Sequence, residues 1–197
     1  MRSIRVLTVT AALLGTAQAA SAQTPSFALD VRGGYAIPTG DWNEEETFEN
    51  GLGFGANVIA MVTPQVGVYA GWETFSFDEE EDEPGVEADA TDAGFRAGVT
   101  LSVPMAQYPT ITPELEVGVL YNSLTISASG EGASIDIESD DALGFEAGAG
   151  VSFNVADRVS VIPMVRYRQH EVTFEEISDE SETVSYVVVG VALRLRL

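Results

Sequence analysis

The sequence predicts an all-β fold, an eight-stranded antiparallel up-and-down barrel with apolar side chains outside and a polar, ion-paired interior. Three observations predict it. After residue 22, apolar and polar residues alternate with a period of two, which is typical of strands and not of helices. Eight alternating segments occur, and short and long connections follow each other between them. The charged residues within these segments share one face and nearly balance in sign.

Residues 1–22 have the features of a secretory signal peptide. Arg2 and Arg5 precede an uncharged apolar stretch, and Ala20-Ser21-Ala22 supplies the small residues of a cleavage site. The apolar stretch is too short to cross a bilayer as a helix. We therefore expect the signal to be removed and the barrel domain to comprise residues 23–197.

Composition excludes several classes of function. The chain has 197 residues, with 9 Lys+Arg against 31 Asp+Glu, and a formal net charge of −22, which argues against nucleic-acid binding. Without cysteine there is no thiolate nucleophile, disulfide or zinc–thiolate site. A single histidine excludes a His-rich metal centre. We expect no metal, no cofactor and no nucleic-acid partner.

The alternating segments define eight predicted strands whose connections differ in length. Three connections are short and four are long, as in an outer-membrane barrel with tight periplasmic turns and long external loops. The strands are expected near residues 27–37, 52–62, 66–77, 93–103, 111–127, 143–155, 159–174 and 184–197. The long connections are 38–51, 78–92, 128–142 and 175–183.

One face of each predicted strand is apolar and uncharged, as in the first strand, where Phe27, Leu29 and Val31 oppose Asp30 and Arg32. A soluble lipocalin-like barrel also alternates but turns its apolar face inward. The polar faces hold five acids against six arginines, a balance that a closed interior requires because an unpaired buried charge is costly. This balance favours a transmembrane barrel with its apolar face toward lipid.

The charged residues of the polar faces are predicted to form an ion-pair network that fills the lumen, because an eight-stranded barrel is just wide enough for its own side chains. The network comprises Asp30, Arg32, Glu73, Arg96, Glu114, Glu116, Glu146, Arg166, Arg168, Arg194 and Arg196. The expected pairs are Glu73 with Arg96, Glu146 with Arg166 and Arg168, and Asp30 with Arg194 or Arg196.

Aromatic residues recur on the apolar faces near the long-connection ends of seven successive strands. A ring of aromatic side chains is expected where lipid headgroups meet the hydrocarbon. This predicted girdle consists of Tyr35, Phe54, Trp72, Phe95, Tyr121, Phe145 and Tyr167.

With its signal, eight strands and alternating apolar last strand, the chain resembles the small bacterial outer-membrane β-barrel proteins of the OmpA-transmembrane and OmpX type. The resemblance implies an integral outer-membrane protein whose last strand is the insertion signal read by the barrel-assembly machinery. Gly190, Leu193, Leu195 and Leu197 match that signal, although the family usually ends in phenylalanine. We expect lipid contact and a monomer.

The function expected from these features is non-enzymatic: a barrel that anchors acidic external loops in a structural or surface-interaction role. Residues 78–92 hold nine acids but lack the ligand spacing and central glycine of a calcium loop. His170 is the one candidate general base, and its position in the alternation places it on the lumen face. A lipid-modifying outer-membrane enzyme and a secreted ligand-binding barrel are the alternatives.

Overall fold

The computed structural model describes residues 26–40, 49–78, 86–130, 133–174 and 178–197. The predicted signal peptide, residues 1–22, lies outside the described residues. These ranges contain nine strands: β1 (Ser26–Pro38), β2 (Gly51–Met61), β3 (Val66–Asp78), β4 (Val86–Ser102), β5 (Ile111–Gly130), β6 (Ala133–Glu138), β7 (Ala142–Ala156), β8 (Val159–Phe174) and β9 (Ser178–Arg196).

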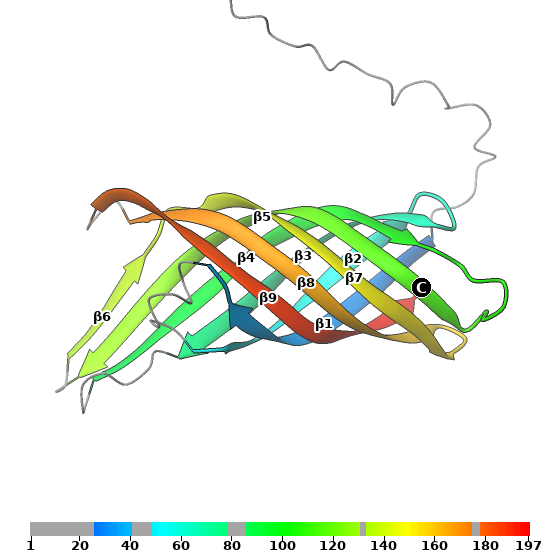
Figure 1. Cartoon of the computed structure of the whole chain (residues 1–197), viewed down its shortest axis with the longest axis horizontal. Coiled ribbons are helices and arrows are strands. Elements are labelled where there is room, and N and C mark those ends of the chain that lie inside the picture. Colours follow the sequence, from blue (N-terminus) through cyan, green and yellow to red (C-terminus); the bar gives the residue numbers. More distant parts are fainter. Residues whose placement is uncertain (1–25, 41–48, 79–85, 131–132, 175–177) are drawn as a thin grey trace, which may run out of the picture.

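Eight of these strands close into the predicted antiparallel up-and-down barrel (Figure 1). The eight barrel strands pair with one another in chain order, β5 pairing with β7 in place of β6, and β9 closes the barrel on β1. Within the described residues, β6 pairs with β5 alone and lies beyond the barrel wall at one end.

The strands are longer at the long-connection end than the sequence predicted. β4 begins at Val86 and β9 at Ser178, both within segments expected to be connections, and β6 was not predicted. The added parts of β4 and β9 are rich in acids, serine and threonine, so they lack the apolar outer face that marks the other strands. A strand that stands in water does not need such a face, which explains why the prediction missed it.

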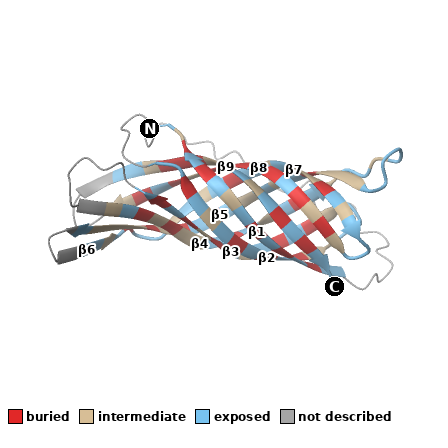
Figure 2. Cartoon of the chain, turned by 90° about the horizontal axis from the view of Figure 1, so that it is seen from below, coloured by how far each residue is buried: buried red, intermediate tan, exposed pale blue. Residues whose placement is uncertain are grey.

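Burial alternates along the strands, and it confirms that the apolar face points outward (Figure 2). In β1, Asp30 and Arg32 are 0% and 3% exposed, whereas Phe27 and Val31 are 44% and 54% exposed. A soluble lipocalin-like barrel has the opposite arrangement. That alternative is wrong for this part of the barrel.

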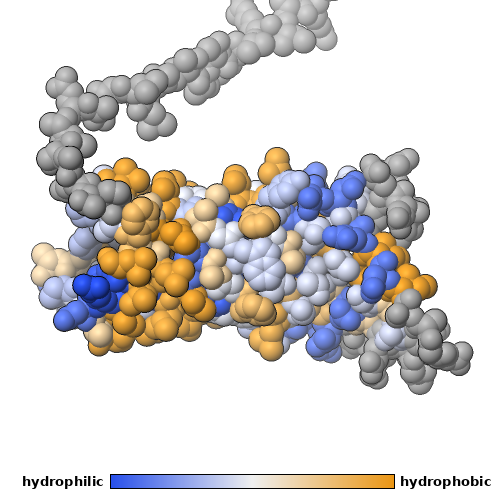
Figure 3. All heavy atoms as spheres, turned by 180° about the vertical axis from the view of Figure 1, so that it is seen from behind, coloured by the Kyte–Doolittle hydropathy of each residue, from blue (hydrophilic) through white to orange (hydrophobic). Residues whose placement is uncertain are grey.

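On β3, β4 and β5 the apolar outer surface ends at one level. Trp72 on β3, Phe95 on β4 and Tyr121 on β5 are direct cross-strand neighbours, and all three are exposed. We call the part from the short turns to this level the membrane section, and the part beyond it the outer section. In Figure 3 hydrophobic residues gather over the half nearer the short turns, and hydrophilic residues over the opposite end.

In the outer section the outward-facing residues are hydrophilic on five strands. They are Thr74, Ser76 and Asp78 on β3, Asp89 and Thr91 on β4, Ser123, Thr125, Ser127 and Ser129 on β5, Gln169, Glu171 and Thr173 on β8, and Ser181 and Thr183 on β9. On these strands the outer surface therefore changes from apolar to hydrophilic beyond the aromatic level.

An apolar cluster occupies the centre of the interior of the outer section, and the sequence did not predict it. The residues Ala36, Phe75, Phe77, Ala90, Leu124, Val172, Val184, Tyr186 and Val188 form one buried cluster, here called the apolar plug. The rings of Phe75 and Phe77 pack on Tyr186 with centroid distances of 5.4 and 5.3 Å. The barrel thus reverses its inside and outside polarity beyond the aromatic level, and burial of apolar side chains stabilises a wall whose outer face is hydrophilic.

Candidate functional site

The interior of the membrane section is the candidate functional site, because it gathers almost all buried charge. We call this set of charged side chains the ion-pair belt. At the end nearer the short turns, Arg194 donates to both carboxylate oxygens of Asp30, at 2.8 and 3.0 Å, and to Glu114 at 2.8 Å. Asp30 faces Arg194 on the adjacent strand, whereas Glu114 is reached across the lumen. Arg194 therefore ties β1, β5 and β9 together.

Arg32 lies one layer further in. It donates to Glu116 at 3.0 Å, across the lumen, and lies 3.4 Å from Asp30. Both Arg32 and Asp30 are buried, and Glu116 keeps slight exposure. This contact joins the Arg194 layer to the centre of the belt.

Arg96 occupies the centre. Its Nε donates to Glu146 at 2.8 Å, its Nη2 contacts Glu116, and its Nη1 lies 3.7 Å from Glu73. Tyr69 donates its hydroxyl hydrogen to Glu146 at 2.7 Å, and its ring lies 4.8 Å from the Arg96 guanidinium. The sequence-derived pair of Glu73 and Arg96 is therefore in contact, but the stronger partner of Arg96 is Glu146.

Arg166 forms the most regular pair. Its two terminal nitrogens donate to the two oxygens of Glu73 across the lumen, at 2.8 and 2.6 Å, and it lies 3.3 Å from Glu146. Such a two-point contact fixes the relative orientation of the two side chains, in addition to the attraction between their charges. Arg168, also expected beside Glu146, faces it directly across the β7–β8 ladder, but its nitrogen lies 4.0 Å away.

Arg168 points instead toward the apolar plug. It donates to the Tyr186 hydroxyl at 2.7 Å, and its guanidinium lies 5.2 and 5.3 Å from the rings of Phe75 and Tyr186. Tyr186 in turn donates to Asp92, which also accepts from Asn122 at 2.6 Å. The hydroxyl of Tyr186 therefore connects the belt to the outer section.

Sequence reasoning missed two members of this hydrogen-bonded group, Asp92 and Tyr186. Asp92 was counted among the acids of the 78–92 connection, yet it is 0% exposed and faces the lumen on β4. The signal that could have found it is its parity with Arg96 on the same strand. The same alternation could have placed Tyr186 on the inner face, because it lies an even number of residues from Arg194 on the same strand.

Arg196 departs from the predicted network in the opposite direction. It is exposed at the short-turn end, where it donates to Asn154 at 2.9 Å and lies 3.5 Å from the Ser160 hydroxyl. It has no carboxylate partner among the described residues. Among the described residues, the interior thus holds six carboxylates and five guanidinium groups, not five and six as the sequence suggested.

Inward-facing glycines make room for the large side chains of the belt. Tyr69 lies along the inner wall over Gly98 and Gly118 on the next two strands, where an added Cβ would lie 2.5 and 2.3 Å from its hydroxyl oxygen. At Gly148 a Cβ would meet the Arg166 side chain at 2.5 Å. Large and small residues therefore alternate around the interior, which allows so many charged side chains to fit in a narrow barrel.

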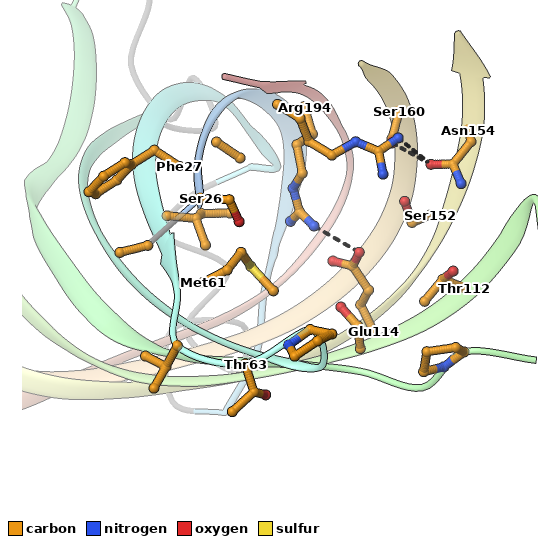
Figure 4. Close-up of a pocket in the computed structure, with 18 residues that line it drawn as sticks. Ser26, Phe27, Met61, Thr63, Thr112, Glu114, Ser152, Asn154, Ser160 and Arg194 are labelled. Carbon is orange, nitrogen blue, oxygen red and sulfur yellow. Dashed lines mark hydrogen bonds and ion pairs between the residues drawn. The ribbon is translucent and has the colours of Figure 1, made fainter. Parts of the chain in front are cut away.

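A cavity of about 650 Å³ lies between the belt and the short turns (Figure 4). The Arg194–Glu114 pair stands at its inner end, Met61 lies on one side, and Thr112 and Ser152 lie on the other. Phe27 points away from it toward the outside. The lumen expected to be filled throughout by ion pairs is therefore hollow at this end.

The predicted girdle residues lie on the outer surface. Six of them are exposed and Tyr167 is half-buried. Phe54 packs on Trp72, and Phe145 packs on Tyr167, with centroid distances of 6.2 and 6.0 Å. The four residues of the predicted insertion signal lie on β9 or directly after it: Leu193, Leu195 and Leu197 are exposed on the outer face, and Gly190 meets Gly34 at the seam with β1.

His170, the candidate general base, faces the interior on β8 and is 2% exposed. Its Nε2 lies 3.7 Å from Asp92. The described residues contain no cluster of His, Cys, Asp and Glu that could hold a metal ion. Across the same residues, no helix is long and apolar enough to span a membrane.

Comparison with known proteins agrees with this architecture. Residues 8–194 match the family described as outer membrane protein beta-barrel domain. The chain belongs to this family. It is an integral β-barrel of the bacterial outer membrane, and contact with lipid follows from that. No curated protein matches the sequence.

Solved structures of outer-membrane barrels share the fold at low sequence identity. The neisserial surface protein NspA is 13% identical with a TM-score of 0.60, covering 87% of this chain and 97% of NspA. A major outer membrane protein of Thermus thermophilus is 12% identical with a TM-score of 0.59, covering 89% of this chain and 100% of its own. OprG of Pseudomonas aeruginosa is 13% identical with a TM-score of 0.50, over 87% and 97% of the two chains.

Proposed function

We propose that this outer-membrane barrel is a sealed, non-enzymatic support that holds acidic external loops above the membrane. The observation that carries the proposal is the double closure of the lumen. The ion-pair belt closes the membrane section above the short-turn cavity, and the apolar plug lies directly above the belt in the outer section. An ion crossing the barrel would have to displace buried charge pairs and then enter an apolar layer, and both steps are costly.

Conductance in planar lipid bilayers tests the seal. We expect no steady open-channel current from the purified barrel, with the same lipid lacking protein as the baseline. Flux of a small cation from proteoliposomes should likewise equal the leak of empty vesicles. A steady unitary conductance, present in every preparation and proportional to the amount of barrel inserted, would contradict the sealed support.

The charge of the external end supports a surface-interaction role. The exposed acids described there are Glu49, Asp78, Asp89, Asp136, Glu138, Asp140, Asp141, Glu171 and Glu182. The strands that carry them stand beyond the aromatic level, so this negative surface is lifted away from the lipid. Such a surface attracts cationic partners, and the attraction weakens as salt rises.

A matched pair of variants tests this role. Oligolysine binding to proteoliposomes is measured with the four acids Asp136, Glu138, Asp140 and Asp141 changed to their amides. We expect weaker binding, and a smaller salt dependence, than in the parent. The control is Asp157→Asn at the short-turn end, which should bind as the parent does. Equal binding by all three proteins would argue against the role.

Three further features belong to the same proposal: the signal peptide, the aromatic girdle and the insertion signal of the last strand. Cross-strand alignment of Trp72, Phe95 and Tyr121 with the start of the hydrophilic outer surface supports an aromatic girdle at the lipid headgroups. The outward leucines of β9 support recognition by the barrel-assembly machinery. We also propose that the mature chain is a monomer. Migration of the folded protein on a sizing column in detergent tests that assignment.

The position of His170 supports a non-enzymatic role over lipid modification. Its side chain is buried within the barrel, and attack on a membrane lipid would need a base that faces the lipid. Mass spectrometry of outer-membrane lipids, from cells with and without the protein, tests this. A lipid product that depends on the protein and disappears in His170→Asn would favour the enzyme.

A further inference from the structure

The cavity at the short-turn end has the form of a binding pocket and not of a passage. Its volume of about 650 Å³ falls within the range of about 300–1,000 Å³ that small-molecule pockets occupy. Its inner end is the Arg194–Glu114 pair, and beyond that pair the belt is buried. A ligand can therefore enter and leave only on the side of the short turns.

The two sides of the cavity differ in character. One side is apolar and comes from β1 and β2, where Ala28, Ile59 and Met61 line it. The opposite side carries hydroxyl and amide groups from β5, β7 and β8, including Thr112, Ser152 and Asn154. Figure 4 shows Met61 facing Thr112 and Ser152 across the space. A ligand that fits both sides has an apolar part and a polar head.

The charge of the lining selects the sign of that head. Arg194 is neutralised by Asp30 and Glu114, so it has no charge left to offer. Arg196 contacts the neutral groups of Asn154 and Ser160, and no described carboxylate lies within ion-pair distance of it. A guanidinium with neutral neighbours at the mouth of a pocket favours an anion, above all a carboxylate, which matches its planar geometry.

We propose that this pocket binds a single-chain anionic amphiphile, with the carboxylate at Arg196 and the acyl chain against Ala28, Ile59 and Met61. The sealed lumen above the pocket makes it a periplasmic binding site, distinct from the acidic surface at the other end. The inference does not depend on the surface-interaction role, because the two ends of the barrel share no residue.

The proposal is tested by nuclear magnetic resonance on the barrel in zwitterionic lipid nanodiscs. Octanoate is the probe, 1-octanol is the uncharged ligand of equal chain length, and acetate is the head without the chain. We expect octanoate to shift the Met61 methyl and the Arg196 side-chain signals in a saturable manner. Octanol and acetate should bind at least about ten-fold more weakly, since each lacks one half of the recognition.

Three variants complete the test. Arg196→Gln removes the charge and should weaken octanoate binding about ten-fold. Arg158→Gln removes the other short-turn arginine, which does not line the pocket, and should leave the affinity unchanged. Ala28→Leu fills the apolar side and should weaken octanoate and octanol alike. The shift in gel mobility between unboiled and boiled samples checks that each variant is folded.

Two results would overturn the proposal. In the first, octanoate shifts only outward methyls such as those of Val58 and Leu29, which would place it in the lipid. In the second, Arg196→Gln and Arg158→Gln bind octanoate equally well while both are folded.

Discussion

Removal of one hydroxyl group provides the sharpest test of how the two halves of the barrel are joined. In Tyr186→Phe the ring keeps its packing on Phe75 and Phe77, and the variant loses only the oxygen that accepts from Arg168 and donates to Asp92. Both partners are 0% exposed, so water does not replace the lost contacts.

The structure sets the size of the effect. A hydrogen bond to a charged group contributes about 1.5–3 kcal/mol, and Tyr186 makes two. Asp92 retains Asn122 as a donor, whereas Arg168 is left without a close acceptor, because its Nε and Nη2 have no hydrogen-bond partner among the described residues. We therefore expect Tyr186→Phe to lower the free energy of unfolding by about 3 kcal/mol, below the full sum of two contacts.

Equilibrium unfolding by urea in lipid vesicles, followed by tryptophan fluorescence, measures this loss. The matched control is Tyr167→Phe, whose hydroxyl donates to Gln169 on the outer face, and which should change stability by less than about 0.5 kcal/mol. The double variant Asp92→Asn with Tyr186→Phe should show non-additive losses, because the two groups are in contact. Two results would refute this expectation. In the first, Tyr186→Phe lowers the free energy of unfolding by no more than Tyr167→Phe does. In the second, the losses from Tyr186→Phe and Asp92→Asn add up in the double variant.

Three further outcomes are expected. Gly118→Val should destabilise the barrel by about 1–3 kcal/mol in the same urea assay, because the added Cβ would displace the Tyr69 hydroxyl from Glu146. The control is Gly33→Val, whose added Cβ has only one atom near it, at 3.6 Å. Equal losses of stability in the two variants would contradict this expectation. Arg166→Met should lower the free energy of unfolding by about 3–5 kcal/mol, because Glu73 loses its two-point partner. Adding Glu73→Gln should recover part of this stability. No recovery would argue against the pair. Leu195→Asp should reduce the amount of barrel recovered in the outer membrane on cell fractionation, whereas Leu195→Ile should not; equal recovery would argue against an insertion signal on β9.

The eight strands of the wall and the orientation of their faces in the membrane section could be predicted from the sequence. Alternation is a local property with a period of two, so the chain itself records which residues share a face. The near balance of charge on the polar face then indicated that it is the inner one. Asp30 and Arg194 came together as expected because they face each other on neighbouring strands.

Contacts across the lumen could not be predicted in this way. Arg166 with Glu73, and Arg194 with Glu114, join strands that are not neighbours, so they depend on barrel shear and on the height at which each side chain reaches the centre. The same holds for Arg96, whose Nε donates to Glu146 on β7 at 2.8 Å, whereas Glu73 on the adjacent strand lies 3.7 Å away.

By itself, then, the sequence determined the membrane-section wall: its eight strands, their antiparallel order and the side that faces lipid. The tertiary structure decided the rest. It showed that β4 and β9 continue past the aromatic level, that Asp92 belongs to the interior, that Arg196 does not, and that a cavity remains at the short turns. The physical reason is that the alternation assigns each residue to one face of its strand. Whether that face is the apolar or the polar one depends on whether lipid or water surrounds that part of the strand, and only the assembled barrel sets that boundary.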